Sequence, residues 1–295
     1  MFKTLKSAFI AVVLVTSQVA WAEKITVAIP NPPGGGLDQV MQVIKSAAQR
    51  QGTEIEIQYH KSCAEAIAFV RQKGKNTFLH IPSDVYDPKN PDAKCALDSD
   101  KDGLHVWGSS ASSPYYFCSA PGKKLSFDKM LALPRKAGVA SAPDLMAYFG
   151  HVISNTKQPN QILVTPYRGG GEIVKAGQAG DIDMWFGASQ IRAFPADQIT
   201  CYGSSVRNDP RGFEFVGNLT KESALVPEYA LVNVLLTNPK NLSTPAAKAM
   251  AAAINSPELR EYMDKNKMAA GTLDGQLLHH NLVKLNQSIK TMQTK

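Results

Sequence analysis

Residues 30–38 read Pro-Asn-Pro-Pro-Gly-Gly-Gly-Leu-Asp and separate a short apolar strand pattern at 25–29 from an amphipathic helix pattern. From Leu37 to Ala48 the apolar residues recur at the i, i+3, i+4 and i+7 spacing of one buried helix face. Three consecutive glycines remove every Cβ from the turn, so a ligand can approach the unpaired N–H groups at the positive end of the helix. The stretch therefore predicts a binding turn for a carboxylate or a phosphate.

Glycines after a strand also occur in plain tight turns, which is the alternative interpretation. The stretch lacks the Gly-Lys-Ser/Thr ending of a P-loop and the spaced third glycine of a dinucleotide fold. A second copy of the arrangement favours ligand binding, because a strand pattern at 161–165 leads into Pro166-Tyr167-Arg168-Gly169-Gly170-Gly171-Glu172 and then a helix pattern. Two such turns predict two half-sites that face each other.

The N-terminus has the form of a secretory signal peptide. A short region with two lysines precedes an apolar run at 8–15, and Ala20-Trp21-Ala22 supplies a small-x-small cleavage site. The apolar run is too short to span a membrane. We therefore expect residues 1–22 to be removed and the mature protein to be soluble in the periplasm.

The chain has 295 residues and a net charge of +7, with its lysines and arginines spread along the sequence. The absence of a basic block argues against nucleic-acid binding. The length suits one large domain or two modest ones, and the order of patterns favours two. We expect a monomer.

Strand and helix patterns alternate in two series, which predicts an α/β protein with two lobes, each a mostly parallel sheet flanked by helices. A strand near 115–119 is expected to cross into the second lobe, and an apolar run at 229–237 to return to the first. The expected boundaries are 23–117 plus 228–295 for lobe 1 and 118–227 for lobe 2.

Four cysteines follow the signal peptide, and an oxidising compartment favours disulfides, of which three pairings are possible. We favour Cys63–Cys95 within lobe 1 and Cys118–Cys201 between two strands near the hinge. No Cys-x-x-Cys spacing is present, which argues against metal or thioredoxin-like chemistry.

An acidic turn at 98–103 matches the first half of a calcium loop through Asp98, Asp100 and Asp102. The position at which a bidentate Glu should close such a loop is Ser109. A solvated acidic turn is therefore the preferred interpretation, and calcium binding is the alternative. No other metal site and no cofactor is expected.

Three motifs together resemble a known family. They are Ile25-Thr26-Val27 leading to the first glycine turn, the segment 164–171, and Gly180-Asp181-Ile182-Asp183-Met184. In this order they are similar to the substrate-binding receptors of tripartite tricarboxylate transporters, also called Bug receptors. The resemblance implies a type II periplasmic binding-protein fold that closes on an organic acid, and membrane permease subunits as partners.

In that family the turns matching 30–36 and 167–169 hold the ligand's carboxylate, largely through backbone groups and water. Two loops depart from the family pattern. Lys61-Ser62-Cys63-Ala64 stands in place of a glycine-rich loop, and Ala140-Ser141-Ala142-Pro143 in place of a Gly-Ser-rich turn. These changes alter side chains that shape the pocket, so the family's usual ligands do not transfer directly.

Several candidate ligand-binding residues have alternative structural roles. Asp38 can stabilise the helix dipole and order its loop, and Arg168 can reach solvent. Asn31 and Ser141 can cap turns, and Asp183 can be a satisfied polar residue of a strand. The full candidate set is Asn31, Gly34, Gly35, Gly36, Asp38, Ser141, Tyr167, Arg168, Gly169, Gly170 and Asp183.

Capture of a small carboxylate for transport is the preferred function. A sensory or accessory protein that signals ligand occupancy to a membrane partner is the alternative. A secreted hydrolase is disfavoured because the sequence has neither HExxH nor GxSxG, and its histidines lack ligand spacing. We therefore expect no enzymatic activity.

Overall fold

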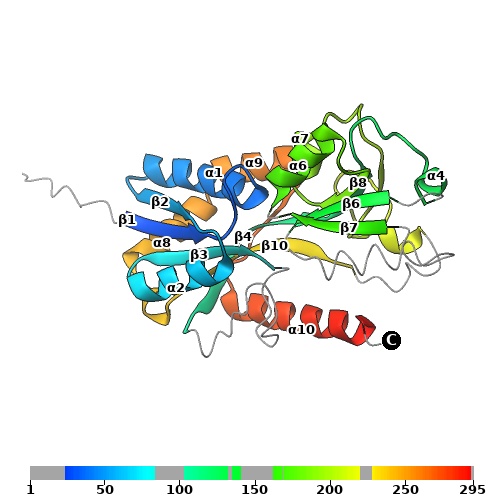
Figure 1. Ribbon diagram of the computed structural model, residues 1–295. Coiled ribbons are helices and arrows are strands. Elements are labelled where there is room, and N and C mark those ends of the chain that lie inside the picture. Colours follow the sequence, from blue (N-terminus) through cyan, green and yellow to red (C-terminus); the bar gives the residue numbers. More distant parts are fainter. Residues whose placement is uncertain are drawn as a thin grey trace, which may run out of the picture.

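The computed structural model describes residues 24–83, 103–131, 135–140, 162–167, 169–219 and 228–293. Two β-sheets, each flanked by helices, lie beside one another as two lobes (Figure 1). The two-lobed α/β fold expected from the sequence is thereby confirmed. The predicted signal peptide lies outside the described residues, and none of the described helices is long and apolar enough to cross a membrane.

Lobe 1 is built on a six-stranded sheet of order β11-β4-β10-β3-β1-β2. β1 pairs in parallel with β2 and β3, whereas β10 pairs antiparallel with β3 and β4, and β11 antiparallel with β4. The strands are β1 (Lys24–Ile29), β2 (Glu54–Tyr59), β3 (Thr77–Pro82), β4 (His105–Pro114), β10 (Ala230–Thr237) and β11 (Ala269–Ala270).

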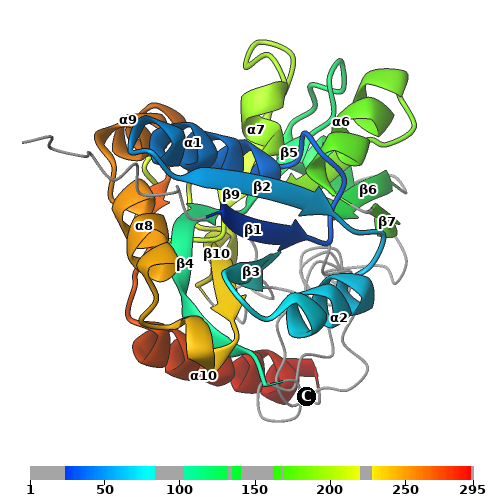
Figure 2. The ribbon, with the colours of Figure 1, turned by 90° about the vertical axis from the view of Figure 1, so that its left-hand side faces the viewer.

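Helices cover both faces of this sheet (Figure 2). α1, α8 and α9 share one apolar cluster with one face, and α2 and α10 share another with the opposite face. The spacing of α1 explains its position, because Val40, Met41 and Ile44 point together into the core. The helices are α1 (Gly36–Arg50), α2 (Cys63–Lys73), η4 (Pro239–Asn241), α8 (Pro245–Ile254), α9 (Pro257–Asn266) and α10 (Gly275–Gln293).

Lobe 2 is built on a five-stranded sheet of order β7-β6-β8-β5-β9. In β8, Trp185 packs toward α6 and α7, while Met184 and Phe186 pack on the opposite face, as the alternation of a strand requires. The elements are β5 (Tyr116–Ser119), α4 (Phe127–Leu131), β6 (Arg135–Ala140), β7 (Ile162–Tyr167), α6 (Gly170–Ala179), β8 (Met184–Gly187), α7 (Gln190–Ala193), β9 (Cys201–Ser204) and η2 (Val216–Asn218).

Both sheets are mixed, which corrects the expectation that they are mostly parallel. In lobe 2 β6 pairs in parallel with β7 and β8, but β5 pairs antiparallel with β8 and β9. The parallel half of each sheet comes from β-α-β units. The antiparallel half includes the strands that carry the chain between the lobes, because β4 leads out of lobe 1 and β10 returns to it in the opposite direction.

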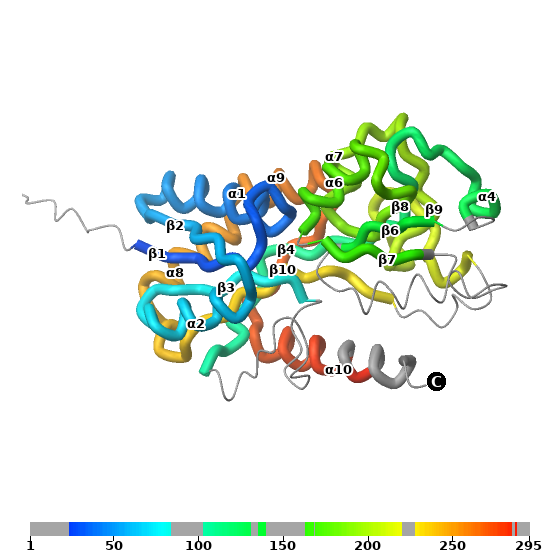
Figure 3. Tube along the Cα trace, viewed as in Figure 1, coloured from blue at the N-terminus to red at the C-terminus, as the bar shows by residue number. Residues whose placement is uncertain are grey.

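The two passages between the lobes lie side by side, where β4 leads into β5 and where β9 leads toward β10 (Figure 3). The backbone N–H of Tyr115 donates to Ser205 Oγ at 2.8 Å, and the N–H of Ser205 donates to the Tyr115 carbonyl at 2.8 Å. The N–H of Tyr229 donates to the Ser205 carbonyl at 2.9 Å, and the rings of Tyr115 and Tyr229 stack with centroids 5.5 Å apart. These bonds tie the two connections into one hinge.

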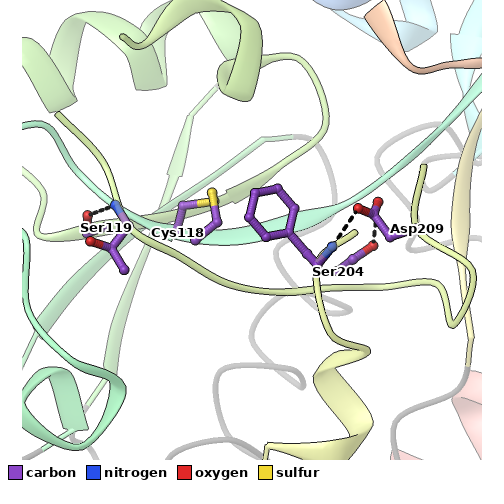
Figure 4. The surroundings of a disulfide bond; sticks show 7 residues. Cys118, Ser119, Ser204 and Asp209 are labelled. Carbon is purple, nitrogen blue, oxygen red and sulfur yellow. Dashed lines mark hydrogen bonds between the residues drawn. A yellow bond between two sulfur atoms is a disulfide. The ribbon is translucent and has the colours of Figure 1, made fainter. Parts of the chain in front are cut away.

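A disulfide joins Cys118 in β5 to Cys201 in β9, which confirms the predicted pairing of these strands (Figure 4). Beside it, Ser119 exchanges two hydrogen bonds with Thr200, from N–H to carbonyl and from the Thr200 N–H to Ser119 Oγ, both at 2.8 Å. Cys95 lies outside the described residues, so the Cys63–Cys95 pairing stays a prediction.

Candidate functional site

A cleft of about 60 Å³ lies between the two lobes. Residues near the start of α1 line it from lobe 1, and residues at the starts of α6 and α7 line it from lobe 2. The crossing strands contribute Ser113, Leu231 and Asn233, which sequence reasoning did not select. The volume corresponds to about four to six water-sized spheres, so the cleft accommodates a small molecule.

The first glycine turn is shaped by Asp38. Gly34 adopts a φ of 87°, which favours glycine, and its N–H donates to Asp38 Oδ2 at 2.7 Å. Asp38 Oδ1 accepts a hydrogen bond from Tyr59 Oη at 2.6 Å and one from Gln42 Nε2 at 3.0 Å. Burial, followed by the Asp38 carboxylate, raises the pKa of Tyr59 to about 12.

Gly34 and Asp38 are not among the residues that line the cleft. The Asp38 side chain is instead directed to the back of the turn, where it is only 7% exposed. This arrangement favours the loop-ordering role for Asp38 over direct contact with a ligand.

Two uncapped helix N-termini meet in the cleft. Gly35 is the N-cap of α1 and Gly169 is the N-cap of α6, and neither helix has a side-chain cap. A Cβ at Gly169 would lie 3.6 Å from Asn31 Nδ2, so the two glycine turns are neighbours across the lobes. The first N–H groups of each helix lack intrahelical acceptors, and together they make this part of the cleft electropositive.

The glycines also allow close packing. A Cβ at Gly36 would lie 3.0 Å from Ser189 Cβ in the other lobe. A Cβ at Gly170 would lie 2.5 Å from Ser189 Oγ and 2.8 Å from Gln190 Nε2. A Cβ at either position would force the Ser189 or Gln190 side chain to shift, so glycine favours the observed approach of the lobes and of α7.

Sequence reasoning missed the segment that follows β8. Ser189, Gln190 and Arg192 all line the cleft. Gln190 is 1% exposed, and its Oε1 has no hydrogen-bond partner among the described residues. A signal was present, because ligands bind at the carboxyl ends of the strands in α/β sheets, and β8 is a parallel strand that ends at Gly187.

Arg192 carries a positive charge from lobe 2 to the start of α1 in lobe 1. Its Nη2 donates to Gln39 Oε1 at 3.3 Å and its Nη1 to Met268 Sδ at 3.7 Å, while the buried Nε has no partner in the described part of the chain. No described carboxylate forms an ion pair with it. Burial lowers the pKa of Arg192.

The remaining candidates lie elsewhere. Tyr167 packs against the apolar cluster between the lobe 2 sheet and α6, away from the cleft lining. Asp183 accepts a hydrogen bond from the Lys136 N–H at 3.0 Å and lies 3.6 Å from Lys123 Nζ, so it secures the start of β6 beside β8. Ser141 and Arg168 lie outside the described residues.

The calcium candidates Asp98, Asp100 and Asp102 also lie outside the described residues. Within the part of the chain that the structure describes, no three His, Cys, Asp or Glu side chains gather in a way that could hold a metal ion. The described cleft thus offers backbone N–H groups, amides, hydroxyls and one guanidinium to a ligand. This chemistry suits reversible binding of a small anion.

Comparison with known proteins identifies the fold. No family model and no curated protein matches the sequence. Among solved structures, the periplasmic binding protein BugD aligns with a TM-score of 0.71 at 12% identity, covering 92% of this chain and 97% of that one.

Two further structures come from Rhodopseudomonas palustris. MatC with bound malate aligns with a TM-score of 0.67 at 15% identity over 90% of this chain and 98% of that one. Rpa4515 with adipate aligns with a TM-score of 0.69 at 14% identity, covering 93% of this chain and 96% of that one. The chain therefore has the two-lobed fold of periplasmic binding proteins.

Proposed function

We propose that this chain is a periplasmic solute-binding protein of the Bug receptor type, which captures a small organic carboxylate between its lobes. The observation that carries the proposal is the cleft, in which the uncapped N-termini of α1 and α6 face each other. Such paired N-termini present N–H donors and positive partial charge to one anion. Delivery to membrane permease subunits of a secondary transporter completes the proposed role.

Two observations support binding without catalysis. The solved structures with malate and adipate show this fold around small acids. None of the described residues that line the cleft is a His, Cys, Asp or Glu, the side chains that most often serve as general bases. A protein that binds and releases a carboxylate unchanged requires none.

The first test is a thermal-shift screen of the mature protein. The panel contains di- and tricarboxylates, short monocarboxylates, amino acids, sugars and phosphate esters, and calorimetry confirms each hit. A ligand that binds only the folded state raises the melting midpoint by mass action. At a ligand concentration of 100 times the Kd, the free energy of unfolding rises by about 2.7 kcal/mol. Stabilisation by carboxylates supports the proposal, whereas stabilisation by sugars or phosphate esters alone contradicts it.

A second test separates transport from sensing. Deleting the gene should abolish cellular uptake of the acid identified in the screen, and the protein should leave the cells on osmotic shock as a monomer that begins at Glu23. Uptake that persists while an acid-dependent transcriptional response disappears would favour the sensory role.

Limited proteolysis would test the proposed lobes, which are residues 23–117 plus 228–295 for lobe 1 and residues 118–227 for lobe 2.

A further inference from the structure

Arg192 brings a positive charge to the N-terminus of α1. Its guanidinium reaches the first turn of α1, where Nη2 lies 3.8 Å from the place of a Cβ at Gly36. A helix N-terminus carries positive partial charge and favours anions, so a cation there is repelled. The positive end of α6 also opens into this cleft. The Asp38 carboxylate lies in the first turn of α1, but it accepts its hydrogen bonds from Gly34, Gln42 and Tyr59. No described carboxylate lines the cleft or forms an ion pair with Arg192.

The neutral contacts of Arg192 do not compensate for this placement. Gln39 Oε1 at 3.3 Å and Met268 Sδ at 3.7 Å are uncharged acceptors at long range. The neighbouring Tyr262, whose hydroxyl donates to the same Gln39 oxygen at 3.4 Å, is also uncharged. Arg211, which also links the two lobes, makes a shorter hydrogen bond, from its Nη2 to the Asn266 carbonyl at 2.9 Å. Arg192 is half-buried, and its Nε is buried without a partner among the described residues. A partly buried charge with incomplete hydrogen bonding costs free energy, and an anion bound beside it would recover that cost.

A second polar side chain in the cleft is similarly incomplete. Gln190 is 1% exposed, and its Oε1 lacks a partner among the described residues. Its amide lies against Gly170, at the N-terminus of α6. Gln190 and Arg192 thus place an amide beside one uncapped helix and a guanidinium beside the other.

We infer that Arg192 is the charge-pairing anchor of the cleft, whose guanidinium binds the same ligand carboxylate that the N-terminus of α1 holds. The inference rests on the proposed function and extends it from backbone binding to a specific ion pair. The ligand class is a carboxylate in its anionic form, and the ion pair makes the protein discriminate against the corresponding neutral amide. Because one fork of N–H groups fits one carboxylate, lysine at this position is a poorer partner.

The test compares Arg192→Gln, Arg192→Lys and the matched control Arg260→Gln with the wild type. Arg260 is exposed on α9, and its substitution removes the same charge outside the cleft. Calorimetry measures binding of acetate, lactate, malate, succinate and adipate, and of lactamide and malamide. Circular dichroism measures the thermal midpoint of each variant without ligand.

We expect Arg192→Gln to weaken binding of the preferred acid by about 10- to 100-fold, the range of a charge-assisted hydrogen bond. Arg192→Lys should fall between this variant and the wild type, and Arg260→Gln should match the wild type. The midpoint of ligand-free Arg192→Gln should be equal to or higher than that of the wild type, because an uncompensated charge has been removed. Discrimination between acid and amide should shrink in parallel.

Two outcomes would overturn the inference while leaving the proposed function intact. One is wild-type affinity for the acid in Arg192→Gln. The other is a lowered melting midpoint of Arg192→Gln without ligand, together with equal losses of affinity for the acid and the amide. That result would give Arg192 a structural role in holding the lobes together. If the wild type itself binds no carboxylate of the panel, the inference and the proposed function both fail.

Discussion

Replacing Asp38 with alanine removes one carboxylate that accepts three hydrogen bonds at the first glycine turn. The donors are the Gly34 N–H at 2.7 Å, Tyr59 Oη at 2.6 Å and Gln42 Nε2 at 3.0 Å. A hydrogen bond to a charged group contributes about 1.5–3 kcal/mol when it is buried. Gly34 and Tyr59 are exposed enough for water to replace the lost acceptor, so we expect a total loss of about 2–4 kcal/mol.

Differential scanning calorimetry of Asp38→Ala and Asp38→Asn would measure this loss. At about 2–4 °C per kcal/mol for a chain of this size, the midpoint of Asp38→Ala should fall by about 5–15 °C. Asp38→Asn keeps one acceptor and should lose less. Asp264→Ala, on the exposed side of α9, is the control and should change stability by less than about 0.5 kcal/mol.

Ligand binding provides the refuting result. If Asp38 orders the turn, affinity and stability should fall together, because the α1 N–H groups lose their fixed direction. If Asp38→Ala instead keeps the wild-type midpoint and loses all binding, the carboxylate contacts the ligand and the loop-ordering role is wrong. The pH dependence adds a check: the raised pKa of Tyr59, about 12, predicts that its bond to Asp38 stabilises the turn below pH 10 and is lost as the pH rises toward 12.

Three further predictions concern other parts of the fold. Gly36→Val should place a side chain against Ser189, hold the lobes apart, weaken carboxylate binding at least tenfold and increase the radius of gyration in small-angle scattering. Replacing Cys118 and Cys201 by alanine should cost up to about 4–5 kcal/mol in denaturant unfolding, the chain-entropy value for a sequence separation of 83, and an unchanged midpoint would contradict it. Burial lowers the pKa of His80 to about 3, below its ordinary 6.5, so the contribution of His80 to stability should be complete above pH 6.5 and fall by about 1.4 kcal/mol per pH unit from there toward pH 3, a slope that His80→Asn should remove.

Local structure was largely predictable because it depends on spacing along the chain. The apolar spacing from Leu37 to Ala48 placed α1 close to its observed bounds. The starts of α8 and α9 follow the same local logic, because a proline comes directly after the capping residue and Thr244 Oγ1 and Ser256 Oγ accept backbone N–H groups. The Cys118–Cys201 pairing followed from recognising two adjacent strands.

Pairing between distant strands was harder to predict. The sequence indicated that residues near 115 and 229 pass between lobes, but not that β4 and β10 pair antiparallel along most of their length. Strand direction depends on which segments meet after collapse, and a local pattern of alternation is the same in parallel and antiparallel sheets. The mixed character of both sheets therefore emerged only in three dimensions.

By itself, the sequence determined the α/β class, the two glycine turns and their placement before helices, since glycine content and periodicity act within a few residues. Only the tertiary structure decided that Asp38 lies behind its turn, and that Arg192 reaches α1 from the other lobe. The function of a charged side chain depends on the groups within a few ångströms of it. For Arg192 those groups are 153 positions away at Gln39 and 76 away at Met268, so the folding of the two lobes against each other creates the site.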